Sequence, residues 1–348
     1  MNKDVIEYVN FSELDVKDPF FDSLTDDYDG FDRWFEKKSL QGEKAYILKG
    51  DNLSGFLYLK EENEADDTIT PKFEKKRRLK VGTFKIDAHG TVLGQRFIGL
   101  ILKRMIEECY SESYVTIFEK QKPLISLFER FGFSRWGKNK NGELVYVKSS
   151  QVHNDLNKDF PRIQSKDRNK FLLSIEPIYH TRLFPDSKLK TERDHKIEDL
   201  SFTNTVEKVY LAGMYGMEKI KPQDLMVIYR KAETGKVAEW NSVATSVCTV
   251  LEKKNIRDFN NIEDFIRYCG KGTIFSKSEL TRLWNSKRYP HILKMLYNIS
   301  LPKRIVRHDL IVEGVIDREA YAGFVHLTDK QFEKVIELGE VNESFVIN

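Results

Sequence analysis

A turn that carries glycines joins a strand-like run to a long helical segment, and such a junction could bind an anion. The run is LKVGTFKID (79–87), the turn is AHGTVLGQ (88–95), and Arg96 follows in the first helical turn. The first N–H groups of a helix have no partner within it, and the helix dipole is positive at that end. With the arginine, these groups would attract a phosphate. An ordinary strand–helix junction also fits this sequence, so the turn alone leaves both interpretations open.

The helix after this turn is expected from about Gly94 to Cys109, because apolar residues recur on one face and charged residues lie opposite. On both sides of it, strand-like and helical segments follow one another up to about residue 148. This mixture predicts an α/β or α+β domain. The apolar face consists of Phe97, Ile98, Ile101, Leu102, Met105 and Ile106.

The order and sequence of these segments resemble the GNAT superfamily of acyl-CoA N-acyltransferases over about residues 5–148. The similar segments are LKVGTFKIDAHGTVLGQRFIGLILKRM (79–105), YVTIFEKQKPLISLFERFGF (114–133) and GELVYVK (142–148). The resemblance implies a GNAT-type mixed sheet with flanking helices. It also implies that strand 81–87 splays from its neighbour and pairs with the pantetheine arm of acetyl-CoA or another acyl-CoA, while the next turn wraps the pyrophosphate. The cofactor-binding residues implied in this way are Phe84, Lys85, Ile86, Gly94, Gln95, Arg96, Phe97, Ile98 and Gly99.

The pyrophosphate turn departs from the family pattern. Leu93 stands where relatives carry Arg or Gln, and Arg96 and Ile98 stand in place of two glycines, so that only Gly94 keeps a small residue. Fewer glycines leave less room for the backbone to approach a pyrophosphate. Either the turn binds CoA with altered geometry, helped by Gln95 and Arg96, or its affinity for the cofactor is weak.

The residues that would move protons are also unusual. Many relatives have a Tyr four residues before the glycine of a Gly-Phe pair, and this Tyr protonates the leaving thiolate. Here the position is Phe128, which has no proton to donate. The attacking amine must also lose a proton, and a carboxylate or a neutral His would accept it. Asp87, His89 and Glu119 are the candidates, and each also fits a solvent-exposed residue at a strand end.

The second half of the chain resembles the PUA-like superfamily, in the manner of ASCH and EVE domains, over about residues 170–340. The similar segments are LLSIEPIYHTRLF (172–184), IKPQDLMVIYRK (220–231) and SVATSVCTVLE (242–252). Gln223 replaces the glycine of a Lys-Pro-Gly-Asp turn. The resemblance implies a β-barrel with helices, in which first-strand and mid-barrel residues line a cleft for RNA or a modified base. The residues implied are Tyr179, His180, Arg182, Tyr229, Arg230, Trp240 and Ser242, and the aromatic ones equally fit the core or rim of a scaffold barrel.

Two helices near the C-terminus have clear start signals. Ser276 is expected to cap one helix, because Glu279 stands three residues later as in a capping box. Thr328 or Asp329 is expected to open the last helix, LTDKQFEKVIELG (327–339). Both signals place helices among the strands of the second half.

Composition limits the class of protein. The chain has 348 residues, with 57 Lys and Arg against 54 Asp and Glu, a formal charge of +3. This length suggests two domains, which we place at residues 1–150 and 170–348 with a polar linker at 151–169. We expect a cytoplasmic protein without a membrane segment, because no apolar run is long enough and no secretory signal is evident. Three widely spaced cysteines predict neither disulfides nor a metal site.

Near-neutral charge argues against indiscriminate binding of polyanions, but local basic surfaces remain possible. One basic cluster lies at residues 72–78 and another at residues 303–308, and each also fits an ordinary solvated surface. We therefore expect selective recognition if the second half binds RNA or modified nucleic acid.

Three functional hypotheses follow. The first is an acetyl-CoA-dependent N-acetyltransferase whose second domain delivers an amine linked to nucleic acid, such as an aminoacyl-tRNA or a base. The second is an RNA-binding or modified-DNA-binding regulatory protein with a catalytically degenerate GNAT fold. The third is an acetyltransferase for proteins or small molecules, in which the second domain recognises a protein partner.

Overall fold

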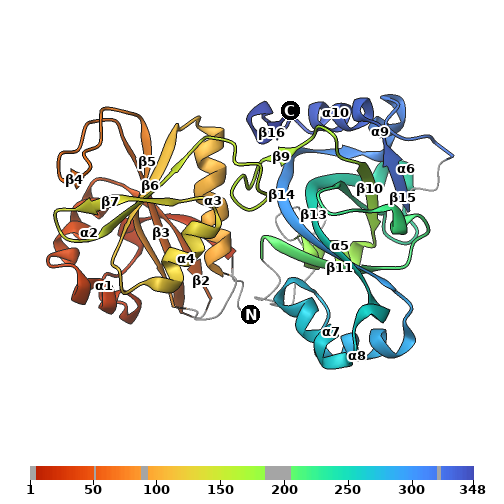
Figure 1. Ribbon diagram of the computed structural model, residues 1–348, viewed down its shortest axis with the longest axis horizontal. Coiled ribbons are helices and arrows are strands. Elements are labelled where there is room, and N and C mark those ends of the chain that lie inside the picture. The colour runs from red at the N-terminus through yellow and green to blue at the C-terminus, as the bar shows by residue number, and fades with distance from the viewer. Residues whose placement is uncertain (1–4, 51, 88–92, 185–204, 320–322) are drawn as a thin grey trace. The chain divides into compact units, whose positions relative to one another are not determined.

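The computed structural model describes residues 5–50, 52–87, 93–184, 205–319 and 323–348 (Figure 1). The chain divides into two compact units, residues 1–153 and 154–348. Each unit contains a mixed sheet with helices, so the predicted α/β class is confirmed.

Unit 1 is built on an eight-stranded sheet in the order β1-β2-β3-β5-β6-β8-β7-β4. Neighbouring strands are antiparallel except β5 and β6, which run parallel. The strands are β1 (Val5–Asn10), β2 (Lys44–Lys49), β3 (Leu53–Glu62), β4 (Ile69–Thr70), β5 (Arg78–Ile86), β6 (Glu112–Ile117), β7 (Ser134–Asn139) and β8 (Leu144–Ser149). The helices are α1 (Asp22–Asp27), α2 (Phe31–Leu40), α3 (Leu93–Glu107) and α4 (Lys122–Arg130), and the short turn η2 (Pro19–Phe21) precedes α1.

The helices of unit 1 cover both faces of the sheet. Successive residues of a strand point to opposite faces, and in β3 Phe56 and Tyr58 pack among the aromatic residues of η2 and α2. Gly55 points to the other face, where a Cβ atom would lie 2.7 Å from the ring of Phe97 in α3. Residue 55 therefore has room only for hydrogen, and α3 packs directly on the strand.

The charged segment between β3 and β5 is anchored to the sheet by buried side chains. Ile69 and Phe73 are buried against Tyr114 of β6. Segment 134–139, which the sequence did not predict as a strand, forms β7 and pairs with both β8 and β4. Its polar residues are largely exposed, so it lacks the buried alternation by which strands are predicted.

Unit 2 has a six-stranded sheet in the order β11-β14-β13-β12-β10-β15, and in Figure 1 its long strands curve around α5. Only β10 and β12 are parallel neighbours. The strands are β10 (Lys170–Ile175), β11 (Glu207–Ala212), β12 (Leu225–Arg230), β13 (Val243–Asn255), β14 (His291–Val306) and β15 (Phe324–Leu327). The helices are α5 (Pro177–Leu183), α6 (Ala238–Asn241), α7 (Ile262–Cys269), α8 (Lys277–Ser286), α9 (Arg307–Val312) and α10 (Asp329–Leu338).

Two expectations for unit 2 are confirmed and one is wrong. Ser276 caps α8 and Thr328 caps α10, each with a complete capping box. Strand β10 ends at Ile175, because Pro177 begins α5, whereas the resemblance implied that the candidate residues after it lie on the first strand. Proline fits the first turn of a helix, where its missing N–H is not needed. Residues 179–182 therefore lie on a helix and not on a first strand.

Residues 154–169, most of the expected linker, are grouped with unit 2. Strand β9 (Ile163–Gln164) pairs in parallel with β16 (Val346–Ile347) near the C-terminus. Ile163 is buried, and the backbone carbonyl of Arg162 accepts a hydrogen bond from Asn298 of β14. Hydrophobic and polar contacts thus hold a segment whose composition is that of a connector.

The Lys-Pro-Gln-Asp turn before β12 is fixed by a buried carboxylate. Asp224 accepts hydrogen bonds from the backbone N–H of Lys221 at 2.7 Å and from the side chain of Asn169 at 3.0 Å. The turn places Gln223 at φ +75°, a backbone conformation that favours glycine. The departure from the family pattern at this residue therefore carries a conformational cost.

We expect Gln223→Gly to raise the free energy of unfolding by about 0.5–1 kcal/mol, because glycine adopts positive φ without strain. Urea denaturation would measure the difference. Gln223→Ala is the matched control, since alanine removes the same side chain and keeps the strain. Equal stability of the two variants would contradict this account of the turn.

Candidate functional site

The parallel pair β5–β6 parts in the middle of unit 1. Only residues 78–81 of β5 pair with residues 112–115 of β6, although both strands continue. On its other side β5 stays paired with β3, but a bulge makes Gly82 an extra residue between Val81 and Thr83. In the described part of the chain, residues 82–86 have no ladder partner on the β6 side. Every second residue there directs its N–H and C=O toward the missing neighbour.

Side chains of the parted strand alternate between the two faces of the sheet. The ring of Phe84 packs at 5.7 Å from Phe97 and at 5.8 Å from Phe128, on the side of α3 and α4. Lys85 points to the other side, where its amine donates to the Ser23 hydroxyl at 2.6 Å and to the Phe20 carbonyl. The parted edge is therefore bordered by aromatic rings on one face and by a hydrogen-bonded lysine on the other.

The N-terminus of α3 lies beside this strand. A Cβ atom on Gly94 would meet Leu127 of α4 at 2.6 Å and Ile86 of β5 at 3.7 Å, so glycine allows α3 to approach both elements. Gln95 and Arg96 are half-buried at the start of the helix. Of the other residues implied for cofactor binding, Gly99 is half-buried, whereas Phe97 and Ile98 have fully buried side chains and could meet a ligand only through the backbone.

The candidate bases differ in their surroundings. Asp87 is half-exposed and lies 3.6 Å from the Lys85 amine, and Glu119 is exposed after β6. His89 lies outside the described residues. Phe128 is fully buried, with its ring 4.8 Å from that of Phe133, so this position supplies no acid to a leaving thiolate.

One carboxylate that sequence reasoning missed lies close to the end of β6. Glu143 is almost fully buried before β8, whose first residue, Leu144, pairs with Ile117. It accepts hydrogen bonds from Tyr28 at 2.9 Å and from the side chain of Asn139 at 2.6 Å. Burial and this carboxylate raise the pKa of Tyr28 above its ordinary value. A glutamate directly before the apolar run LVYV (144–147) was the available sequence signal.

The basic cluster of residues 72–78 is not a free cationic surface. Arg78 and Lys76 both pair with Glu112, at 2.9 and 2.6 Å, and Arg77 pairs with Glu61 at 2.8 Å. Lys72 and Lys75 also have glutamate partners. These ion pairs support the interpretation as an ordinary solvated surface.

In unit 2, the residues expected to contact nucleic acid separate by burial. Four of them are buried, and Tyr179 and Arg182 on α5 are half-buried. Trp240 is 57 % exposed on the short helix α6. The buried residues are His180, Tyr229, Arg230 and Ser242.

His180 belongs to a buried polar cluster. Its Nε2 atom lies 2.8 Å from the Thr245 hydroxyl, while its buried Nδ1 atom has no hydrogen-bond partner among the described residues. Burial, together with the positive charges of Arg230 and Arg304, lowers the pKa of His180 from 6.5 to about 3. The imidazole is therefore neutral at physiological pH, and it is too deep to meet a ligand at the surface.

Arg307 connects this cluster with the surface around Trp240. Its backbone N–H donates to the Ser242 carbonyl at 2.8 Å, and its guanidinium lies 3.5 Å from the Tyr229 hydroxyl. The Ser242 hydroxyl in turn accepts from the backbone N–H of Ala232 at 2.8 Å. Tyr229 and Ser242 are therefore buried residues that position Arg307 at the start of α9, and they are not themselves exposed to a ligand.

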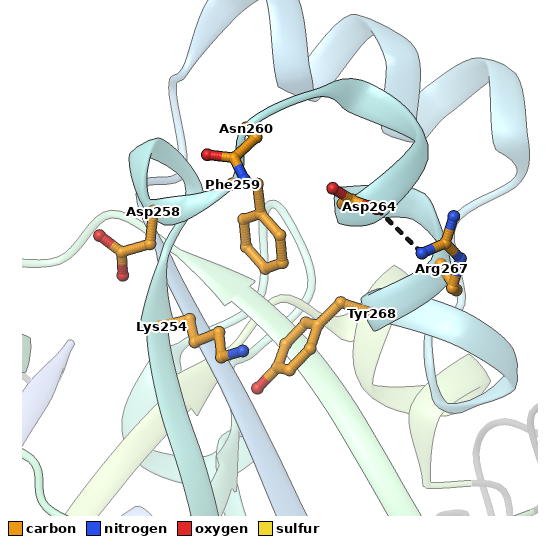
Figure 2. A pocket seen from close by; sticks show the side chains of 7 residues that line it. All are labelled: Lys254, Asp258, Phe259, Asn260, Asp264, Arg267 and Tyr268. Carbon is orange, nitrogen blue, oxygen red and sulfur yellow. Dashed lines mark hydrogen bonds and ion pairs between the residues drawn. The ribbon is translucent and has the colours of Figure 1, made fainter.

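A shallow pocket of about 370 Å³ lies elsewhere in unit 2, between the end of β13 and α7 (Figure 2). Figure 2 shows the amine of Lys254 directed toward the ring of Tyr268, at 4.5 Å from its centre. The charged groups of the pocket serve local structure: Asp264 pairs with Arg267 at 2.9 Å, and Asp258 accepts from a backbone N–H. We therefore do not assign a ligand to it.

No protein-family model matches the sequence, and no curated protein matches it. Among solved structures, the chain is similar to the N-acetyltransferase PseH of Campylobacter jejuni, with 15% identity over 42% of this chain and 99% of that one and a TM-score of 0.28. A GNAT family acetyltransferase from Elizabethkingia anophelis with acetyl-CoA bound has 11% identity over 42% and 99%, with a TM-score of 0.29. A mutant of the ZmASCH protein of Zymomonas mobilis has 10% identity over 49% and 97%, with a TM-score of 0.32.

Within the described ranges, three or more His, Cys, Asp or Glu side chains nowhere gather as they would around a metal ion. Among the helices of the same residues, none combines the length and the apolar character needed to cross a bilayer.

We expect His180 to make unit 2 less stable as the pH falls. Its folded pKa is below the unfolded one, so the unfolded chain takes up the proton first and stability is lost from about pH 6.5 downward. Between pH 7 and pH 5 the loss should be about 2 kcal/mol. Differential scanning calorimetry at pH 7, 6 and 5 would measure it.

The control for this prediction is His180→Gln, which removes the titrating group but keeps a polar side chain. The melting temperature of this variant should fall less between pH 7 and pH 5 than that of the unmodified protein. Equal decreases in the melting temperatures of the variant and the unmodified protein would show that His180 does not titrate as described.

Proposed function

We propose that unit 1 is an acyl-CoA-dependent N-acyltransferase and that unit 2 binds RNA or a modified nucleic acid carrying the acceptor amine. The observation that supports the first part most directly is the parting of β5 from β6 after Val81. It occurs in the strand for which the resemblance to the GNAT superfamily implies it. A bulge at Gly82 and a helix start beside Ile86 accompany it.

The residues of unit 1 suit an acyl-CoA. Unpaired backbone groups of residues 82–86 would hydrogen-bond the amides of a pantetheine arm, and the start of α3 with Gln95 and Arg96 would hold phosphates. Bound acyl-CoA would supply a thioester carbonyl to the acceptor amine, and backbone N–H groups could stabilise the oxyanion that forms. Asp87, Glu119 and Glu143 are the described carboxylates near the strand ends that could accept the amine proton, directly or through water.

Isothermal titration with acetyl-CoA tests the proposal at its first step. Binding in the micromolar to millimolar range is expected, and a failure to bind at millimolar acetyl-CoA would overturn the enzyme proposal. Catalysis would then be tested by incubating the protein with acetyl-CoA and candidate amines and measuring the free CoA thiol that acetyl transfer releases.

We expect Arg96→Ala to weaken binding of acetyl-CoA about tenfold, because one charge-assisted hydrogen bond to a phosphate would be lost. Lys103→Ala is the matched control. Lys103 is an exposed cation of the same helix and lies 3.7 Å from Glu107, far along α3 from its N-terminus. Isothermal titration of both variants with acetyl-CoA measures the difference. Equal affinities of the two variants would show that Arg96 does not contact a phosphate of the cofactor.

A second candidate is a nucleic-acid-binding regulatory protein whose unit 1 has lost catalysis. The fully buried Phe128 favours it, since no proton donor occupies the position at which relatives carry tyrosine. This candidate predicts nucleic-acid binding that acetyl-CoA does not change, and acetyl transfer by the purified protein would reject it. Acetylation of a peptide or small amine without any effect of RNA would instead favour an ordinary protein or small-molecule acetyltransferase.

A further inference from the structure

The most unusual exposed feature of unit 2 is a pair of stacked rings on two neighbouring short helices. The indole of Trp240 on α6 lies 4.2 Å from the imidazole of His308 on α9, with an angle of 25° between their planes. Trp240 is nevertheless 57 % exposed. One face of the indole is thus covered by histidine, while much of the ring remains open to solvent.

A chain of polar contacts holds this pair in place. His308 Nδ1 lies 2.8 Å from one oxygen of Glu239, and the other oxygen accepts from Arg318 at 2.5 Å. The guanidinium of Arg307 donates to the Arg318 carbonyl at 3.0 Å. The hydrogen bonds with His308 and Arg318 also lower the pKa of Glu239, so this carboxylate stays charged and keeps both partners. The rings are therefore fixed before any ligand arrives.

The charges around the rings favour an anionic partner. Arg318 is 56 % exposed, and its guanidinium has more N–H donors than its bond to Glu239 uses. Arg307 adds a second cation at the start of α9, and Glu239 is shared between two partners. An aromatic face next to guanidinium groups is the combination that binds an unstacked base and its phosphate.

We propose that Trp240, backed by His308, is a stacking platform for one base of a single-stranded nucleic acid, with Arg318 and Arg307 contacting the adjacent phosphates. This inference rests on the proposed nucleic-acid function of unit 2 and names the surface and mode of binding. The base is recognised by stacking on the indole, so both RNA and single-stranded DNA fit the chemistry. A duplex fits poorly, since its bases are already stacked and paired.

Fluorescence anisotropy of labelled 12-nucleotide RNA, DNA of the same sequence and the matching duplex, with the full chain, would test this proposal. Trp240→Ala should weaken binding of the single strand about 10- to 100-fold, the range measured for loss of base–aromatic stacking. Trp240→Phe should bind with intermediate affinity. Trp136→Ala is the matched control, because Trp136 is 43 % exposed in unit 1 and should not affect binding.

Two further measurements separate stacking from a general electrostatic effect. Contacts with two phosphates predict a shallow dependence on salt, with a slope of about −1.4 in log K against log salt for a single strand. Glu239→Gln should weaken binding, since the amide lacks the charge and the second acceptor oxygen with which Glu239 holds His308 and Arg318 in place. A general electrostatic effect would instead predict tighter binding, because the substitution removes a negative charge beside Arg318.

The possible failures are distinguishable. If the unmodified chain binds single strands and Trp240→Ala binds them within twofold of it, the platform is wrong while nucleic-acid binding by unit 2 stands. If no oligonucleotide binds below about 100 µM, both the platform and the proposed nucleic-acid function of unit 2 are wrong. The proposed acyl-CoA binding by unit 1 is tested separately, by the titration with acetyl-CoA.

Discussion

Strand β5 has two neighbours over its first half and one neighbour over its second half, and the change at Gly82 decides which groups border the candidate site of unit 1. A bulge inserts one residue, and glycine is needed there because a Cβ atom would lie 2.7 Å from the ring of Tyr58. Beyond the bulge, Phe84 faces α3 and α4, and Lys85 faces η2 and α1. The backbone between them keeps hydrogen-bonding groups that no described strand satisfies.

If unit 1 binds an acyl-CoA as proposed, the parted strand would contribute mainly backbone groups to the site, and the departures from the GNAT pattern at α3 would then matter less. An interaction with peptide N–H and C=O groups does not depend on side-chain identity. The substituted positions lie instead at α3, where Ile98 is buried in the core and Gly94 lets the helix approach Leu127. The absence of a tyrosine is more serious for the proposed reaction, because Phe128 is fully buried and its side chain has no proton to donate.

Unit 2 uses its polar residues at two depths. His180 and Thr245 lie inside, where burial keeps the imidazole neutral and makes it sensitive to acid. Trp240 and His308 lie outside, fixed by Glu239 and Arg318. A chain with a formal charge of +3 can thus carry a local cationic surface, because cations elsewhere, such as Arg77 and Arg78, are paired with glutamates. The proposed recognition of one base and a few phosphates needs only such a local cationic surface, and it does not need a high net charge.

Local sequence patterns determined much of the fold. Alternation and helical periodicity indicated most strands and helices, and glycine and proline marked their ends. Ser276 and Thr328 determine two helix starts through hydrogen bonds to residues only three positions later. Such signals are local, so one sequence carries them. The start of α5 at Pro177 and the edge strand β7 were missed, since a continuous apolar run and a polar edge give no periodic signal.

The functional surfaces required tertiary structure, because their members are distant in sequence. Tyr28 meets Glu143, His180 meets Thr245, and Trp240 stacks on His308 only after strands and helices have packed. Residue type suggested that Tyr229, Arg230 and Trp240 could all contact a base, but burial left only Trp240 exposed. The sequence alone thus indicated two domains and the chemistry that each could perform. Packing decided which of the candidate residues can reach a ligand, since burial depends on contacts that no local pattern contains.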